Sequence, residues 1–234
     1  HLGVAHLYRS ARQVSHNYTR PCFALKCDIK KFFASVNHKI LFSIITQKVT
    51  DPDFLNLLQR IIDSFNADSG QGLPIGNLTS QVFANIYLNQ LDQFVKHNLK
   101  VKYYLRYTDD FIILSPSLSY LRSLLPSIQA FLKHKLNLEL HPHKVKFLNL
   151  KTGIDFLGYI IFPHHILPRF KTRKRLLKKI TAKINQYHQG KINYHSLYQT
   201  VQSYLGYLTH SNSYKLRQHI LRLLPPAPLT EQNP

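Results

Sequence analysis

The order of apolar and polar positions along the chain predicts a mixture of helices and strands. Apolar residues recur every three to four positions in some segments, as in helices, and form short β-branched and aromatic runs in others, as in strands. Asn37 and Asp51 stand where helix N-caps are favoured, and Pro52 suits a first helical turn. We therefore expect helices at about 4–18, 38–48, 52–65, 78–98 and 117–136, and strands at about 23–28, 102–107, 111–115, 145–148 and 155–162.

The pattern changes at Arg169. The segment "RFKTRKRLLKKITAKI" combines dense positive charge with an apolar stripe, and two further helical patterns follow to about residue 223. The final stretch, "PPAPLTEQNP", has no such pattern. We expect a first domain of residues 1–168, a helical domain of residues 169–224 and a flexible tail of residues 225–234.

Two adjacent carboxylates interrupt an apolar pattern in "KYYLRYTDDFIILS". Asp109 and Asp110 fall between two expected strands, which predicts a tight hairpin with both carboxylates at its tip. At about 4 Å and an effective dielectric near 20 they would repel by roughly 4 kcal/mol, so a cation is expected nearby. An isolated Asp pair is more often a polar turn than a catalytic site. Asp28, at the end of another expected strand, changes that balance because three carboxylates suit a metal site.

Composition points to a polyanionic partner. The chain has 31 Lys and Arg against 11 Asp and Glu, a formal charge of +20, together with 14 Tyr and 14 Phe that offer stacking surfaces. Nucleic acid is therefore the leading candidate. At 234 residues and 44% hydrophobic content the chain can bury a substantial core, and its mixed pattern predicts an α+β fold.

Several other features of the sequence bear on where the protein acts. No apolar run approaches the roughly 18 residues of a membrane span, so no membrane partner is expected. Cys22 and Cys27 would lie roughly 16 Å apart along one strand, beyond disulfide reach, which favours reduced thiols and a cytoplasmic protein. The chain opens with His1 and contains no Met, which favours a piece of a longer protein that lacks its N-terminus.

The chemistry that suits the acids is phosphoryl transfer with two metal ions. One cation activates a 3′-hydroxyl and a second neutralises the leaving pyrophosphate. Mg²⁺ prefers carboxylate oxygens and keeps several waters, so Asp28, Asp109 and Asp110 would suffice as the protein ligands. No Cys or His spacing suggests zinc.

Four blocks carry a resemblance to a known family. "CDIKKFFASVNH", "GLPIGNLTSQVFANIYLNQLD", "YTDDFIIL" and "FLGY", in this order and spacing, resemble the palm motifs of reverse transcriptases over roughly residues 20–160. The resemblance implies a right-hand polymerase, with an antiparallel palm sheet and packed helices, partial fingers and a helical thumb. Within the superfamily, Ile75 and Gln81 of "IGNLTSQ" resemble the reverse transcriptases of diversity-generating retroelements, where other groups usually carry a Gln-Gly start and a Ser-Pro end.

The resemblance implies a role for each matching residue. Asp28, Asp109 and Asp110 would bind two Mg²⁺ ions, or Mn²⁺, with help from the Ile29 carbonyl, and Lys144 would protonate the pyrophosphate. Phe33 would be the steric gate that excludes a 2′-hydroxyl, so the substrates would be dNTPs. The remaining implied residues contact the nucleotide (Lys31, Phe32, Ile75, Gly76), grip the primer (Phe156, Leu157, Gly158, Tyr159) or bind nucleic acid in the thumb (Arg169, Lys171, Arg173, Lys174, Arg175, Lys178, Lys179).

The expected activity is RNA-directed DNA synthesis with a template RNA, a primer and its cDNA as partners. The subfamily resemblance adds error-prone copying, with misincorporation opposite adenine, and a basic accessory protein. The chain departs from the family at Thr108, where Met or Ala is commoner, and the basic residues of the fingers would lie before residue 1. One alternative is a group II intron type reverse transcriptase with maturase activity. Another is a non-catalytic RNA-binding protein on a decayed polymerase fold.

Simpler interpretations stand beside these roles. Phe33 could be ordinary core, and Ile75 could be nothing more than loop packing. Lys144 could be a solvated charge, and the basic run after Arg169 could be a solvated helix face.

Overall fold

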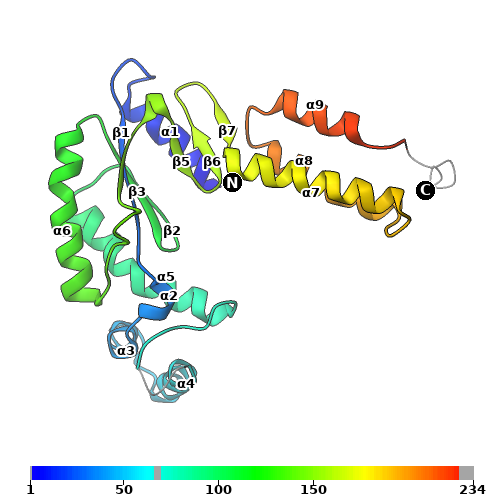
Figure 1. Cartoon of the computed structure of the whole chain (residues 1–234). Helices are drawn as coiled ribbons and strands as arrows, with labels where there is room; N and C mark the ends of the chain where they lie inside the picture. The colour runs from blue at the N-terminus through cyan, green and yellow to red at the C-terminus, as the bar shows by residue number, and fades with distance from the viewer. Residues whose placement is uncertain (1, 66–69, 227–234) are drawn as a thin grey trace. The chain divides into compact units, whose positions relative to one another are not determined.

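The central sheet is built around the strand that ends on Asp28. In the computed structural model of the protein, which describes residues 2–65 and 70–226, β1 (Phe23–Asp28) lies inside an antiparallel sheet of order β2-β3-β1-β4 (Figure 1). The other strands are β2 (Tyr104–Tyr107), β3 (Asp110–Ser115) and β4 (Lys146–Asn149). The sheet belongs to a compact unit, Arg9–Asn149, which we call the sheet unit.

Helices cover one face of this sheet. Leu25 and Cys27 of β1 and Phe111 and Ile113 of β3 share a core with apolar residues of the helices, and α6 contacts both strands. The helices and helical turns of this unit are α2 (Phe32–Ser35), α3 (His38–Thr46), α4 (Pro52–Asp63), α5 (Leu78–Gln93), the π-helical turn η1 (Phe94–Asn98) and α6 (Leu118–Leu136).

The expected N-caps are confirmed. The Asn37 side chain accepts a hydrogen bond from the Ile40 amide at 3.1 Å, and the Asp51 side chain accepts one from the Phe54 amide at 2.8 Å. Each satisfies one amide that the first helical turn leaves without an intrahelical partner. The expected helix at 4–18 is α1 (Leu2–Val14), which ends earlier because His16, Asn17 and Tyr18 have positive φ angles.

Residues 2–8 and 150–226 form a second compact unit, which we call the C-terminal unit. The single strand expected at 155–162 is a hairpin, because Leu157 and Gly158 turn the chain, and a third strand joins its edge. The elements are η2 (Leu150–Thr152), β5 (Ile154–Phe156), β6 (Tyr159–Ile161), β7 (Ile166–Pro168), α7 (Phe170–His188), α8 (Tyr194–Leu208) and α9 (Tyr214–Leu223).

The helices of the C-terminal unit have a core of their own. Leu176 and Ile180 of α7 pack against Leu197 and Val201 of α8 and Ile220 of α9. The helices expected after Arg169 are therefore confirmed, as is the α+β class. The expected domain boundary at residue 169 stays a prediction, and most of the expected tail, residues 227–234, lies outside the described residues.

Two other expectations can be compared with the structure. Cys22 and Cys27 are both free and buried, as expected, and burial raises the pKa of each thiol to about 12. Within residues 2–65 and 70–226, none of the helices has the length and apolar character needed to cross a membrane.

Candidate functional site

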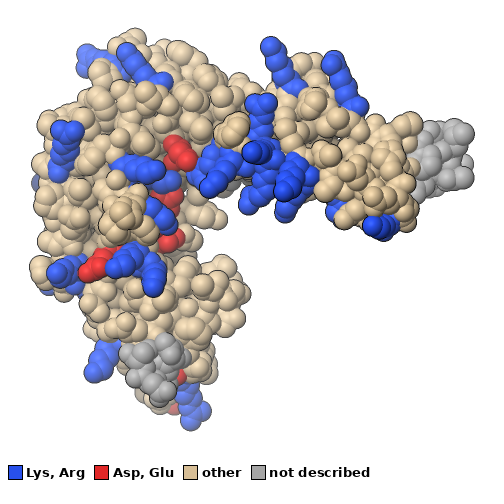
Figure 2. Space-filling view, in the orientation of Figure 1, with Lys and Arg blue, Asp and Glu red and all other residues tan. Residues whose placement is uncertain are grey.

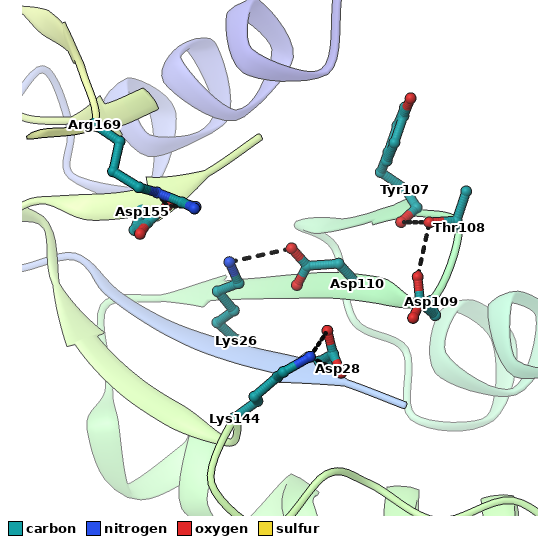
Figure 3. Close-up of polar contacts among 9 residues, drawn as sticks. All are labelled: Lys26, Asp28, Tyr107, Thr108, Asp109, Asp110, Lys144, Asp155 and Arg169. Carbon is teal, nitrogen blue, oxygen red and sulfur yellow. Dashed lines mark hydrogen bonds and ion pairs between the residues drawn. The ribbon is translucent and has the colours of Figure 1, made fainter. Parts of the chain in front are cut away.

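Three carboxylates from two regions of the sequence meet at one corner of the sheet (Figure 3). Asp28 is the last residue of β1 and Asp110 the first of β3, and the antiparallel register places them directly opposite each other. Asp109 lies in the two-residue turn between β2 and β3, and its carbonyl accepts a hydrogen bond from the Ile29 amide at 3.2 Å. The predicted hairpin is confirmed, although Asp110 is already part of the strand and only Asp109 lies in the turn.

The two strand carboxylates lie on the face of the sheet opposite the one that shares a core with α6. Side chains alternate between faces along a strand. Leu25 and Cys27 point into the helix-covered core, so Lys26 and Asp28 point the other way. Asp110, opposite Asp28 in the register, lies on the same face.

Two lysines supply the positive charge that the adjacent carboxylates lead us to expect. Lys26 Nζ lies 3.1 Å from Asp110 Oδ2, and Lys144 Nζ lies 2.9 Å from Asp28 Oδ1 and 3.0 Å from its Oδ2. Lys144, whose simpler interpretation was a solvated charge, therefore contacts a predicted site residue. Lys26 was missed, although its place two residues before Asp28 puts it on the same strand face.

The charges at this corner act on the pKa values of Asp110 and Lys144. Burial raises the pKa of Asp110, the charges of Asp28 and Asp109 raise it further, and Lys26 lowers it. The hydrogen bond to Asp28 raises the pKa of Lys144, and all three Asp charges act in the same direction. The corner thus concentrates negative charge and favours cations.

The carboxylate oxygens at this corner are of the kind that binds a divalent metal ion. Oδ1 of Asp110 is buried and has no hydrogen-bond partner among the described residues, an arrangement that is costly for an anionic oxygen. Carboxylate oxygens are the ligands that Mg²⁺ and Mn²⁺ prefer. Across the described residues, no three His, Cys, Asp or Glu side chains converge closely enough in this conformation to hold a metal. Lys26 and Lys144 instead pair with Asp110 and Asp28, so a metal ion would compete with these two ammonium groups for the carboxylates.

A partly buried polar network supports the turn that carries Asp109. Arg106 binds both carboxylate oxygens of Asp92 on α5, at 2.8 and 2.7 Å, and donates to the Thr108 carbonyl at 3.0 Å. Thr108 has a φ of 52°, and its hydroxyl donates to Asp109 Oδ1 at 2.9 Å. Tyr104 also donates to Asp92, at 2.7 Å. Sequence reasoning missed Arg106, although a charged residue inside a strand pattern was a usable signal.

We expect Arg106→Ala to lower the free energy of unfolding by about 3–5 kcal/mol, because it leaves the largely buried Asp92 carboxylate without its cation. Urea denaturation of the purified protein measures this. Arg106→Lys should fall between wild type and Arg106→Ala, since it keeps the charge and loses the two-pronged contact. A decrease below about 1 kcal/mol for Arg106→Ala, the size typical of a surface ion pair, would contradict a structural role for this network.

The expected nucleotide-contacting residues lie in the same unit as the carboxylates. Lys31 has a φ of 46° and precedes α2, whose Phe32 is buried and whose Phe33 is half-buried against the core. Ile75 is 86% exposed, so loop packing does not account for it. Gly76 has a φ of 105°, which favours glycine.

The expected primer-grip and thumb residues lie in the C-terminal unit. Phe156, Leu157, Gly158 and Tyr159 form the end of β5, the turn and the start of β6. Arg169 is half-buried and pairs with Asp155 (Figure 3). Figure 2 shows Lys and Arg gathered over α7. The exposed members of the expected set are Lys171, Arg173, Lys174, Arg175, Lys178 and Lys179.

Sequence comparison identifies related proteins. The profile of the family described as "Reverse transcriptase (RNA-dependent DNA polymerase)" matches residues 5–161. The chain is 22% identical to the "Putative COX1/OXI3 intron 2 protein" of Saccharomyces cerevisiae over 70% of this chain and 26% of that protein. It is 25% identical to Escherichia coli "Protein YkfC" over 60% of this chain and 47% of that protein. It is 33% identical to the Lactococcus lactis "Group II intron-encoded protein LtrA" over 32% of this chain and 14% of that protein. The chain thus spans less than half the length of each of these relatives.

Solved structures share the fold. Apo telomerase from Candida tropicalis, truncated from its C-terminal domain, superposes with a TM-score of 0.56 at 15% identity, over 71% of this chain and 39% of that chain. Telomerase from Candida albicans in complex with a fragment of telomeric RNA superposes with a TM-score of 0.52 at 14% identity, over 77% of this chain and 38% of that chain. With its antiparallel sheet and packed helices, the fold resembles a polymerase palm, as expected from the sequence.

Proposed function

The chain belongs to the reverse transcriptase (RNA-dependent DNA polymerase) family, and from that premise we propose that it extends a primer with dNTPs on an RNA template. The observation that carries the proposal is the corner of the sheet at which Asp28 and Asp110 face each other across two strands, with Asp109 beside them. The matched family and the basic α7 helix both support a nucleic-acid substrate.

Each residue of the corner has a part in the proposed chemistry. Asp28, Asp109, Asp110 and the Ile29 carbonyl would hold two Mg²⁺ ions. When bound, such ions lower the pKa of the attacking 3′-hydroxyl and neutralise the leaving pyrophosphate. Lys144 places its ammonium beside Asp28, and a protonated lysine in that place has a proton to give to the pyrophosphate. Lys26 keeps the buried Asp110 carboxylate charged and oriented until the metal binds.

The expected choice of sugar rests on Phe33. Its side chain is half-buried and its carbonyl accepts a hydrogen bond from the Leu73 amide at 2.6 Å, which ties α2 to the loop that carries Ile75 and Gly76. The Phe33 ring packs edge-on against the buried Phe32, with centroids 5.3 Å apart, and a ring held there would exclude a 2′-hydroxyl by bulk. We therefore propose dNTPs as substrates.

A primer-extension assay tests the proposal. The purified protein, with an RNA template, an annealed DNA primer and Mg²⁺, should extend the primer with dNTPs and not with rNTPs, and EDTA should stop the reaction. RNA binding with no extension under any metal would favour the alternative of a non-catalytic RNA-binding protein on a decayed polymerase fold.

The finer assignment concerns the kind of retroelement. We propose error-prone copying in a diversity-generating retroelement on the strength of Ile75 and Gln81, and the basic accessory protein stays a prediction with it. The names of the related proteins favour a second candidate, a group II intron type reverse transcriptase with maturase activity. An assay for splicing of a cognate intron RNA separates the two, because maturase activity is expected of the second alone.

Ile75→Gln tests the proposed infidelity. Ile75 is 86% exposed and offers only apolar contact, so a mispaired nucleotide in a shifted pose leaves no polar protein group unpaired. Once a bound nucleotide covers position 75, a Gln side chain there would impose a penalty of about 1–3 kcal/mol on a pose that leaves its hydrogen bond unmade. We expect the Gln variant to misincorporate less, particularly opposite template adenine, while much of the correct incorporation is retained.

Sequencing cDNA made by both enzymes on one RNA template measures this change. Leu78→Gln is a suitable control, because Leu78 is also largely exposed, at 76%, and lies three residues further along, at the start of α5. Indistinguishable error spectra for wild type and Ile75→Gln would remove Ile75 from the fidelity determinants.

A further inference from the structure

The turn between β5 and β6 has a strained backbone. Leu157 and Gly158 have φ angles of 49° and 88°, so both central residues of this two-residue hairpin are in the left-handed region. Gly adopts this conformation readily, whereas Leu does so at a cost. A turn of this kind keeps its shape only when its surroundings hold it.

Tyr207 of α8 holds the turn from outside the hairpin. Its hydroxyl donates to the Gly158 carbonyl at 3.0 Å, and the Arg169 amide donates to the same carbonyl at 2.8 Å. In return, the Tyr159 hydroxyl donates to the Tyr207 carbonyl at 2.8 Å. The two tyrosine rings stack with centroids 4.8 Å apart. The two tyrosines are 48 positions apart in sequence, so this reciprocal pair ties the hairpin to the helical bundle.

Gly158 lies close against Tyr207. A Cβ at position 158 would lie 3.0 Å from the Tyr207 hydroxyl oxygen, which is tighter than nine in ten real contacts of this kind, so the hydroxyl would have to shift. Glycine is therefore favoured both by its φ angle and by the approach of the hydroxyl.

The same tyrosine borders the cationic part of the bundle. Tyr207 lines a cavity of about 290 Å³ together with Arg175 and Lys179 of α7. Both cations belong to the set expected to contact nucleic acid. The turn, the tyrosine pair and these two cations thus lie within one unit and share contacts.

We propose that Tyr207 is a positioning residue that fastens the turn at 157–158 to the basic helical bundle, so that both hold the primer strand as one rigid body. The inference rests on the proposed function, because the primer is the ligand of the turn. It assigns to Tyr207 a role that neither the motif "FLGY" nor the basic run contains. The hydroxyl, rather than the ring, carries the role.

Tyr207→Phe removes the hydroxyl and keeps the ring. At saturating template-primer and dNTP we expect single-nucleotide incorporation to slow about fivefold, the effect typical of removing one hydrogen bond. The KM for dNTP and the thermal midpoint should stay near wild type, since the bundle core is untouched. Tyr198→Phe is the matched control on the same helix, because the Tyr198 side chain is 44% exposed. An unchanged rate for Tyr207→Phe, or an equal decrease for Tyr198→Phe, would overturn the proposal.

A double-mutant cycle tests the contact itself. Gly158→Ala should slow incorporation in the wild-type background by a larger factor than in the Tyr207→Phe background, because only the former contains the hydroxyl that the new Cβ meets. The cost of the positive φ is common to both backgrounds and cancels. Equal factors in the two backgrounds would contradict the assigned contact.

Amide hydrogen exchange tests the contact between Tyr207 and the turn independently of polymerase activity. Tyr207→Phe should speed exchange of the amides around the turn and of the Arg169 amide, and Tyr198→Phe should not. This readout needs no polymerase activity. If the wild-type protein does not extend a primer but Tyr207→Phe still speeds exchange at the turn, the proposed function is wrong and the contact between Tyr207 and the turn is supported. If Tyr207→Phe leaves exchange unchanged, the positioning role of Tyr207 is wrong whatever the activity.

Discussion

Asp109→Ala will reduce Mg²⁺-dependent dNTP incorporation by about a thousandfold or more while RNA binding survives. The carboxylate is proposed to hold the cations that neutralise charge in the transition state, and removing one such ion costs several kcal/mol of barrier, which corresponds to about that factor. Affinity for RNA comes mainly from Lys and Arg, which this change does not touch. Primer extension measures the first quantity and filter binding the second.

Asp28→Ala should show the same decrease, and it separates a catalytic role from a structural one. Asp28 and Asp110 face each other across two strands, and like charges in that position are destabilising. Removing Asp28 also removes its ion pair with the half-exposed Lys144, an interaction worth up to about 1 kcal/mol, so the free energy of unfolding should stay within about 1 kcal/mol of wild type even though activity disappears. Asp53→Ala, at an exposed position in the first turn of α4, is the control. Near-wild-type incorporation by Asp109→Ala or Asp28→Ala would end the assignment of a metal site.

The pairing of Asp28 with Asp110 shows how far the sequence alone could reach. The apolar run of β1 predicted one strand and the interrupted run around Asp109 predicted a hairpin of two more, because such patterns depend only on local periodicity. The face-to-face register of Asp28 and Asp110 links residues 82 positions apart and depends on strand order. Pattern reasoning could therefore name the three carboxylates, and family resemblance could join them, but neither could show which two are opposite.

Side-chain pairing was harder to foresee than strand position. Lys26 and Arg106 were both visible as charges within strand patterns, yet their partners Asp110 and Asp92 come from elsewhere in the chain. Burial decides such pairs, since a charge placed in a half-buried strand must find a counter-charge. Looking for unexplained charges inside apolar strands would have identified both the lysine and the arginine as candidates.

The hairpin of β5 and β6 could not be predicted from the apolar pattern, although the family resemblance implies a turn at residues 156–159. The segment "IDFLGYIIF" is a nearly continuous apolar run, which is typical of one buried strand. The turn depends on a positive φ at Leu157 as well as at Gly158, and Leu gives no sequence signal for that conformation. Contacts from α8 stabilise the turn, so the information lies about 50 residues downstream, in the Tyr207 that meets Gly158 49 positions away.

Neutralising four cations of α7 together will weaken template-primer binding and flatten its dependence on salt. We choose Arg173, Lys174, Lys178 and Lys179, all exposed, and replace each by Gln. Arg169 is left intact because it pairs with Asp155. Each phosphate that the protein no longer neutralises should reduce the steepness of the plot of log affinity against log salt by about 0.7–0.9, so the four replacements together should reduce it by up to about 2.8–3.6.

The control must remove the same charge from elsewhere. Lys96, Lys100, Lys133 and Lys135 are exposed on the sheet unit, and their replacement by Gln lowers the net charge equally. A general attraction between a protein of charge +20 and RNA would make the two quadruple variants alike. Direct phosphate binding by α7 requires a much larger change in slope for the α7 set than for the control set. Titrations from about 50 to 200 mM salt cover the range in which such binding changes affinity most visibly. Equal slopes in the wild type and the α7 variant would mean that this helix presents its charges to solvent, and primer-template binding would then have to be carried by other cations of the chain.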